Sequence, residues 1–130
     1  SDHGLSINKN RITQTDGFFF EDGKKGFLEL ISQNPDVTAV LAGSDDMAVG
    51  ILSAAYNLGI KVPDDLSLMG YDNLKIAEMA IPTLTTVAQP FEKMGERAAE
   101  MVFEMLTTGN MVESYYFPHK IIERQSVKAI

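Results

Sequence analysis

Apolar runs of strand length alternate with helical patterns along most of the chain. Residues 38–42 and 66–69 are short apolar runs, whereas the apolar positions of residues 47–58 recur at the spacing of an amphipathic helix. Together these patterns predict helices at residues 22–32, 47–58, 74–80 and 91–108 and strands at residues 38–42, 66–69, 84–88 and 115–123. Because strands and helices alternate, we expect an α/β fold, a three-layer sandwich with a mostly parallel central sheet. Residues 1–16 are polar and predict a loop with a short strand near residues 11–15.

Two polar segments, residues 43–46 and 70–73, directly follow the strands predicted at residues 38–42 and 66–69. A helix joins these strands, and a crossover of that length returns the chain to the same end of the sheet, so we expect the strands to be parallel. Both polar segments then lie at the carboxyl edge of the sheet, where open α/β sheets bind ligands. The sequence therefore predicts that they form half of a small-molecule site.

The composition narrows the classes of function. The 130 residues are 45% hydrophobic and carry a formal net charge of −7. This charge argues against DNA binding by this segment itself, because DNA affinity rests largely on Lys and Arg at phosphates. The absence of cysteine excludes disulfides, thiolate zinc sites and cysteine nucleophiles and suits a reducing compartment. No apolar segment could span a bilayer and no export signal is present, so we expect a cytoplasmic protein without membrane contact. Since the first residue is not Met, we expect that the chain is processed, tagged or excised from something longer.

One set of side chains could support catalysis, the carboxylates Asp45, Asp46 and Asp72 at the predicted strand ends. Three carboxylates at one sheet edge could bind a divalent cation or take part in phosphoryl transfer. A phosphoryl-accepting domain of that type also needs a lysine on the loop after a later strand. The corresponding loop, residues 85–90, contains none, which argues against this reading.

The remaining residues do not complete a catalytic site. His3 and His119 are far apart in the sequence, and we interpret both as surface or structurally satisfied histidines. The glycine spacing does not match a dinucleotide fingerprint. Methionines at helical spacing within residues 91–108 are typical of core or partner-facing packing. We therefore expect a binding module with no catalytic residue, metal or cofactor rather than an enzyme.

Several candidate residues have a structural alternative. Asp45, or Ser44 before it, is well placed as the N-cap of the helix predicted at residues 47–58. Asp72 could instead bond its own backbone in a turn. The three successive aromatics of residues 18–20 cannot all face one core, so at least one is expected to reach a surface or a pocket. Packing of all three in the core or against local residues is the alternative.

Four stretches resemble the LacI/GalR family of bacterial transcription repressors. They are residues 42–50 (AGSDDMAVG), 59–73 (GIKVPDDLSLMGYDN), 82–95 (PTLTTVAQP, then Met-Gly) and 118–126 (PHKIIERQS). The match runs from about residue 16 to the C-terminus, in order and with the family's spacings. It implies the C-terminal lobe of a periplasmic-binding-protein-like core, in which two α/β lobes enclose a ligand cleft.

The resemblance also implies how such a protein works. A small-molecule effector, expected to be a sugar or a nucleobase, controls how a homodimer binds its operator. DNA would be bound only through an N-terminal head outside this chain. In the family, the helix matching residues 91–108 packs in the other lobe, so its apolar stripe needs cover from the sheet of this lobe or from a second chain. A fragment of a periplasmic sugar-binding protein of the same fold is the alternative.

Positions in the matched motifs imply two sets of functional residues. Those implied to contact the effector are Asp72, Asp45, Ser44, Phe18 and Gln89. Asp72 matches the family's effector-contacting aspartate, whereas Ser44 stands where many members have asparagine. Those implied to form a dimer surface are Val49, Leu52, Met79 and Ile81, for which ordinary core packing is the alternative.

Overall fold

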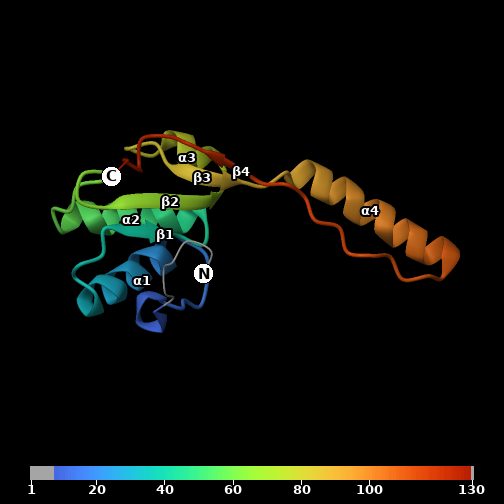
Figure 1. Cartoon of the computed structure of the whole chain (residues 1–130), viewed down its shortest axis with the longest axis horizontal. Coiled ribbons are helices and arrows are strands. Elements are labelled where there is room, and N and C mark those ends of the chain that lie inside the picture. The colour runs from blue at the N-terminus through green and yellow to red at the C-terminus, as the bar shows by residue number, and fades with distance from the viewer. Residues whose placement is uncertain (1–7, 130) are drawn as a thin grey trace.

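The computed structural model describes residues 8–129 (Figure 1). Its helices are α1 (Phe20–Gln33), α2 (Asp45–Asn57), α3 (Lys75–Met79) and α4 (Phe91–Thr108), and a 3₁₀ turn, η1 (Lys9–Arg11), precedes them. Its strands are β1 (Ala39–Leu41), β2 (Ser67–Asp72), β3 (Thr85–Ala88) and β4 (Lys120–Ile122). They form one sheet in the order β1-β2-β3-β4, in which the first three are parallel and β4 is antiparallel to β3. The predicted α/β class with a mostly parallel sheet is confirmed.

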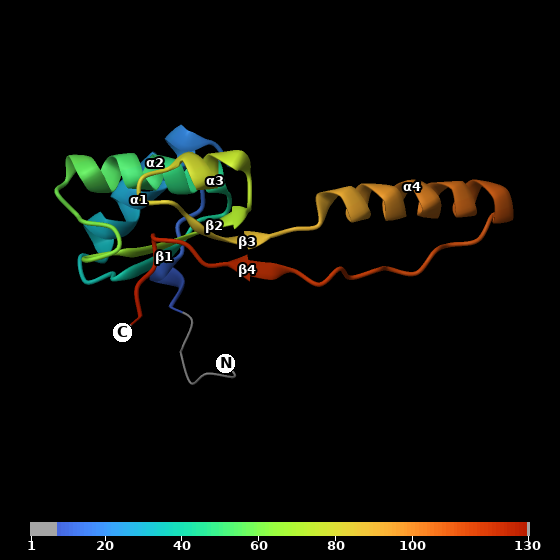
Figure 2. The same ribbon diagram turned by 90° about the horizontal axis from the view of Figure 1, so that it is seen from above.

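Two predicted strands differ from the structure. Residues 11–15 do not form a strand, because the chain passes from η1 into an irregular segment. The strand predicted over residues 115–123 is limited to Lys120–Ile122, since the residues before it run back along α4 and have no strand beside them (Figure 2). His3 lies outside the described residues, and His119 is exposed.

Helices α1 and α2 approach each other so closely that glycine is required at two positions. A Cβ at Gly50 would lie 2.0 Å from the carbonyl oxygen of Phe20, and a Cβ at Gly23 would lie 2.1 Å from that of Met47. This contact sets the start of α2 beside the aromatic segment that leads into α1. The core of the lobe consists of Phe27, Ala42, Ala48, Ile51, Ala54, Ala55, Leu66, Leu68, Ala77 and Leu84.

Helices α2 and α3 cover one face of the sheet (Figure 2). On this face Leu68 and Thr86 are fully buried. The described part of the chain sets no helix over the opposite face, where Leu41 of β1 and Ile121 of β4 are 66% and 58% exposed. Of the three layers expected, the described residues thus form the sheet and one helical layer.

Helix α4 stands apart from the sheet (Figures 1 and 2). None of its residues is buried, and Val102 and Leu106 are 57% and 81% exposed. The segment that returns to β4 contributes a few contacts: Arg97 lies 5.9 Å from the ring centre of Tyr115, which packs edge-on against Phe117. The sheet of this lobe therefore does not cover the apolar stripe of α4, which leaves a second body as its expected cover.

Candidate ligand-binding site

The carboxyl ends of β1, β2 and β3 lie at one edge of the sheet because the three strands are parallel. Ser44 follows β1, Asp72 ends β2, and Gln89 follows β3. Asp72 pairs with Ala88 in the register of β2 and β3, which sets Gln89 beside it. The structure thus brings together the polar tips that the sequence predicted at this edge.

Asp72 holds a strained position at this edge. Its φ angle is 105°, a value that costs a residue with a side chain about 1–3 kcal/mol. Gln89 Nε2 donates a hydrogen bond of 2.6 Å to Asp72 Oδ1, so the carboxylate bonds across the sheet edge rather than to its own turn. Such strain clusters at ligand sites, where the surrounding structure maintains it. The geometry therefore makes Asp72 the first candidate for ligand contact.

Ser44 is the N-cap of α2. Its Oγ accepts a hydrogen bond of 3.1 Å from the Met47 backbone N–H and donates one of 2.6 Å to the Phe18 carbonyl oxygen. Only 6% of the residue is exposed, and its hydroxyl is already hydrogen-bonded within the chain. Of the two predicted caps, Ser44 rather than Asp45 takes the position, and it ties the aromatic segment to the tip of β1.

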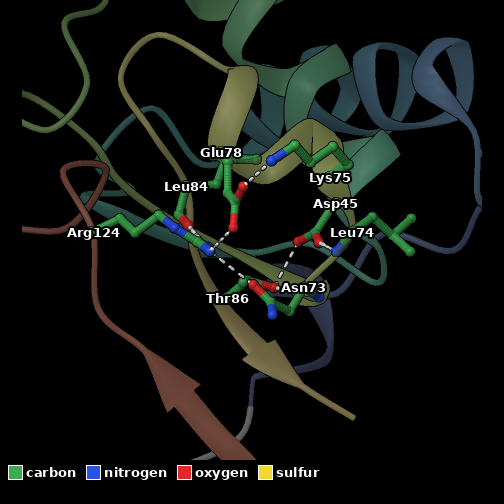
Figure 3. A network of polar contacts seen from close by, with 8 residues as sticks. All are labelled: Asp45, Asn73, Leu74, Lys75, Glu78, Leu84, Thr86 and Arg124. Carbon is green, nitrogen blue, oxygen red and sulfur yellow. Dashed lines mark hydrogen bonds and ion pairs between the residues drawn. The ribbon is translucent and has the colours of Figure 1, made fainter. Parts of the chain in front are cut away.

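Asp45, the first residue of α2, is fully buried beneath the strand tips (Figure 3). The Leu74 backbone N–H donates to its Oδ2 and the Thr86 hydroxyl donates to its Oδ1, both at 2.6 Å. Gly70 leaves room for this carboxylate, since a Cβ there would lie 2.2 Å from Oδ1. Burial raises the pKa of Asp45 above its ordinary value, because desolvation outweighs the two hydrogen bonds that favour the charged form. Ligand contact by Asp45 stays a prediction, but the side chain acts first as an internal acceptor.

The aromatic segment that leads into α1, residues 18–20, reaches the same edge. Phe18, Phe19 and Phe20 are 68%, 72% and 37% exposed, so the alternative that all three pack in the core is wrong. Phe18 lines a pocket of about 680 Å³ together with Gly43 and Met47, and the pocket extends from the tip of β1 along that strand. Phe18 thus has an aromatic face available beside the polar tips.

Two residues near the C-terminus fix the strands, Arg124 at the turn after β2 and Ser126 at the amino ends of β2 and β3, although neither was singled out as a site residue from the sequence. Arg124 donates from Nη1 to the Leu84 carbonyl at 2.8 Å and from Nη2 to Asn73 Oδ1 at 2.9 Å (Figure 3). Ser126 is fully buried, accepts a hydrogen bond of 2.9 Å from the Thr85 N–H and donates one to a carbonyl of β2. Their occurrence in the matched terminal motif, residues 118–126, was the only signal in the sequence.

The residues predicted at a dimer surface fall into two groups on the helical side of the sheet. Met79 and Ile81, in and just after α3, are 70% and 93% exposed. Val49 and Leu52 of α2 are partly buried and pack against the core. The surface remains a prediction, in which Met79 and Ile81 have the most area to offer a partner.

Comparison with known protein families agrees with the fold described above. Residues 1–127 match the family described as periplasmic binding protein-like domain. The chain belongs to this family. The periplasmic binding protein-like chain is 39% identical over 124 residues to the HTH-type transcriptional repressor PurR of Serratia proteamaculans (strain 568). That match covers 95% of the chain and 36% of the relative, so the chain spans little more than a third of the length of such relatives.

Solved structures of the family have the same fold. The transcriptional regulator CelR, in complex with cellobiose, superposes with a TM-score of 0.89 at 30% identity, over 96% of this chain and 38% of that one. The Escherichia coli transcriptional repressor ascG superposes with a TM-score of 0.82 at 29% identity, over 98% and 46%. A LacI-type transcription regulator from Bifidobacterium animalis subsp. lactis superposes with a TM-score of 0.87 at 25% identity, over 98% and 46%. Together these relatives confirm the resemblance to LacI/GalR regulators. They are transcription regulators rather than enzymes, and they do not favour the periplasmic sugar-binding alternative.

Two further features concern membranes and metals. Within residues 8–129, no helix combines the length and the apolar character needed to cross a membrane. The same residues contain no group of three or more His, Cys, Asp or Glu side chains arranged to hold a metal ion.

Proposed function

We propose that this chain is the C-terminal, effector-sensing lobe of a bacterial transcription repressor and that it supplies one wall of a small-molecule site. The observation that carries the proposal is the strained Asp72, held by Gln89 at 2.6 Å at an open sheet edge. The CelR regulator, which shares this fold and was solved with cellobiose, supports it. Operator binding would belong to an N-terminal head in the remainder of the protein, acting in the cytoplasm as a homodimer.

The chemistry of this edge suits a sugar or a nucleobase. One oxygen of Asp72 accepts a hydrogen bond from Gln89, and the other oxygen can accept a hydrogen bond from a ligand hydroxyl or ring N–H. The exposed ring of Phe18 offers an apolar face against which a sugar ring or a base stacks. Ser44 and Asp45 hold the segments that carry these groups. Ser44 donates a hydrogen bond to the Phe18 carbonyl, and Asp45 accepts one from the Leu74 N–H, two residues after Asp72.

We also propose that α4 packs against a second lobe of the same protein. The chain leaves β3 through Gln89 and Pro90, forms α4, and returns to β4 beside its starting point (Figure 1). A body that covers the exposed stripe of Val102 and Leu106 would therefore face the sheet edge that carries Asp72. Covering this stripe would remove an apolar patch from water and close the ligand site at the same time.

Calorimetric titration with cellobiose, glucose, adenine and hypoxanthine tests the proposed site. The 130-residue chain alone is expected to bind these compounds weakly or not at all, because half the cleft is missing and good sites bury about 70–90% of a ligand. A longer form that includes the second lobe is expected to bind at least one of them. There, Asp72→Ala should weaken binding about 10- to 100-fold, the effect of losing a hydrogen bond to a charged group.

The matched control is Asp36→Ala. Asp36 follows α1, is exposed and forms an ion pair with Arg11 of η1, so its loss should leave binding unchanged. Thermal unfolding should show that Asp72→Ala remains folded. Sub-micromolar binding by the 130-residue chain alone, or undiminished binding by Asp72→Ala, would contradict the proposed site.

The proposed dimer surface has its own test. In the two-lobe protein, Ile81→Glu is expected to raise the dimer dissociation constant by about 100-fold, because a charge would be buried in an apolar contact. Sedimentation velocity over a range of concentrations measures the shift. Leu28→Glu, on the exposed side of α1, is the control and should leave the dimer intact. A dimer that tolerates Ile81→Glu would locate the interface elsewhere.

A further inference from the structure

Neighbouring groups hold consecutive residues of the turn that follows β2. Asp72 and Asn73 have positive φ angles, 105° and 56°, a conformation that persists only where neighbouring groups maintain it. The Asn73 backbone N–H donates to Thr86 Oγ1 at 3.3 Å, and the Leu74 N–H donates to Asp45 Oδ2 at 2.6 Å. These bonds hold the backbone of the turn, and the Asn73 side chain has a partner of its own.

That partner is Arg124, on the segment after β4 (Figure 3). Its Nη2 donates to Asn73 Oδ1 at 2.9 Å, its Nη1 donates to the Leu84 carbonyl at 2.8 Å, and its backbone N–H donates to Thr85 Oγ1 at 2.9 Å. The side chain is only 15% exposed, and a guanidinium holds its donors in fixed directions. Arg124 is thus anchored at β3 and reaches from there to the turn.

The same guanidinium nitrogen also faces α3. Arg124 Nη2 lies 3.5 Å from Glu78 Oε1, and the other oxygen of Glu78 accepts from Lys75 Nζ at 2.5 Å. Helix α3 begins at Lys75, two residues after Asn73. The turn and the helix therefore share one cation, and α3 ends at the exposed Met79.

We infer that Arg124 is a positioning residue that fixes the Asp72–Asn73 turn against β3 and ties it to α3, so that a change at Asp72 is transmitted to α3. The inference rests on the proposed function only in treating Asp72 as the ligand contact. Arg124 acts through Asn73 and Glu78, and the link between turn and helix exists in the chain without any ligand.

Some of the same contacts would be present if Arg124 only fixed the C-terminal segment to β3. Ser126 allows the two roles to be separated. It lies two residues from Arg124, is fully buried, and hydrogen-bonds β2 and β3 rather than the turn or α3. Loss of Ser126 loosens the segment, whereas loss of Arg124 loosens the turn and α3 as well.

Amide hydrogen exchange, followed by NMR in the ligand-free 130-residue chain, distinguishes these roles. In Arg124→Met, exchange at Leu74 and at Ala77, whose N–H bonds the Leu74 carbonyl, is expected to rise at least about tenfold relative to Ile60, because a charged hydrogen bond is lost. In Ser126→Ala, Leu74 should show no rise beyond that of Ile60. Equal selective rises in both variants, or no rise in Arg124→Met, would overturn the inference.

Glu78→Gln isolates the α3 half of the link. It is expected to raise exchange at Ala77 by about threefold, the effect of weakening an exposed ion pair, and to leave Leu74 unchanged. If Arg124→Met does not fold, Arg124→Lys replaces it, since a compact ammonium lacks the planar fork by which two nitrogens of the guanidinium reach Leu84, Asn73 and Glu78. A wild-type exchange rate at Leu74 in Arg124→Lys would then overturn the inference.

Calorimetry with cellobiose, glucose, adenine and hypoxanthine decides the proposed function separately. A two-lobe protein that binds none of these compounds removes the support for an effector site at Asp72 and leaves the expected exchange pattern intact. Binding that depends on Asp72, together with no selective exchange at Leu74 in Arg124→Met, would remove the positioning role of Arg124 and leave the effector site.

Discussion

Replacing Asp45 with alanine is expected to lower the free energy of unfolding by about 2–4 kcal/mol. The buried carboxylate accepts hydrogen bonds from the Leu74 N–H and the Thr86 hydroxyl, both at 2.6 Å. Alanine would leave the buried Thr86 hydroxyl and the part-buried Leu74 N–H without this acceptor, at about 1–3 kcal/mol for each buried group. Part of the loss is offset because the wild-type protein buries a charged group, as the raised pKa of Asp45 indicates. Urea unfolding followed by circular dichroism measures the difference.

Asp46→Ala is the matched control, since Asp46 occupies the same first turn of α2 but is not fully buried. Its effect should stay below about 1 kcal/mol, the range of a helix-terminus charge. Asp72→Ala should also stay below about 1 kcal/mol, because it removes one hydrogen bond at a partly exposed position. If Asp72→Ala were the more destabilising of the two site variants, Asp72 would be the structural carboxylate and Asp45 the better ligand candidate.

The pH dependence of stability gives an independent test of the burial of Asp45. The folded-state pKa of Asp45 is raised above the ordinary value of 3.8 by burial, so the folded protein binds this proton more tightly than the unfolded chain. Its contribution to stability is therefore full below pH 3.8 and is lost as the pH rises through the raised pKa. The stability of wild type relative to Asp45→Asn should accordingly increase as the pH falls toward about 4. Glu78, whose pKa is lowered mainly by Lys75, is present in both proteins, so its contribution to the pH dependence cancels in the comparison.

Gly50→Ala is expected to lower the free energy of unfolding by about 3 kcal/mol or more, or to prevent folding. The added methyl group would lie 2.0 Å from the Phe20 carbonyl oxygen and 3.1 Å from the Lys24 backbone nitrogen. Backbone atoms of a packed helix cannot move aside as a flexible side chain can, so α1 and α2 must separate. Separation would also shift Phe18 and the tip of β1, since Ser44 joins them. Urea unfolding and the dispersion of methyl NMR signals measure both consequences.

Gly95→Ala provides the control for the same chemical change. Gly95 lies inside α4, and nothing lies within 4 Å of a Cβ added there. Alanine in an open helix interior is favoured over glycine by about 1 kcal/mol, so α4 should gain helicity. A wild-type stability for Gly50→Ala would show that the two helices pack less closely than the structure has them.

The order of helices and strands, the mostly parallel sheet and the polar edge with Asp72 were all predictable from the sequence. Helical and strand periodicities report which face of each element is buried, and that information is local. The motifs of residues 42–50 and 59–73 then identified the family from residues close in the sequence. The prediction of a strand near residues 11–15 was wrong, because a short polar run carries little of this periodic signal.

Only the tertiary structure decided what each polar side chain does. Asp45 and Asp72 are both acidic residues at strand tips, yet one is sealed beneath the sheet edge and the other is partly exposed. The contacts that separate them join distant residues: Asp45 meets Thr86, 41 positions away, and Arg124 meets Asn73, 51 positions away. Burial and pKa depend on such long-range packing, which local patterns do not encode. The isolation of α4 has the same origin, because its periodicity predicts an apolar stripe but not the surface that covers it.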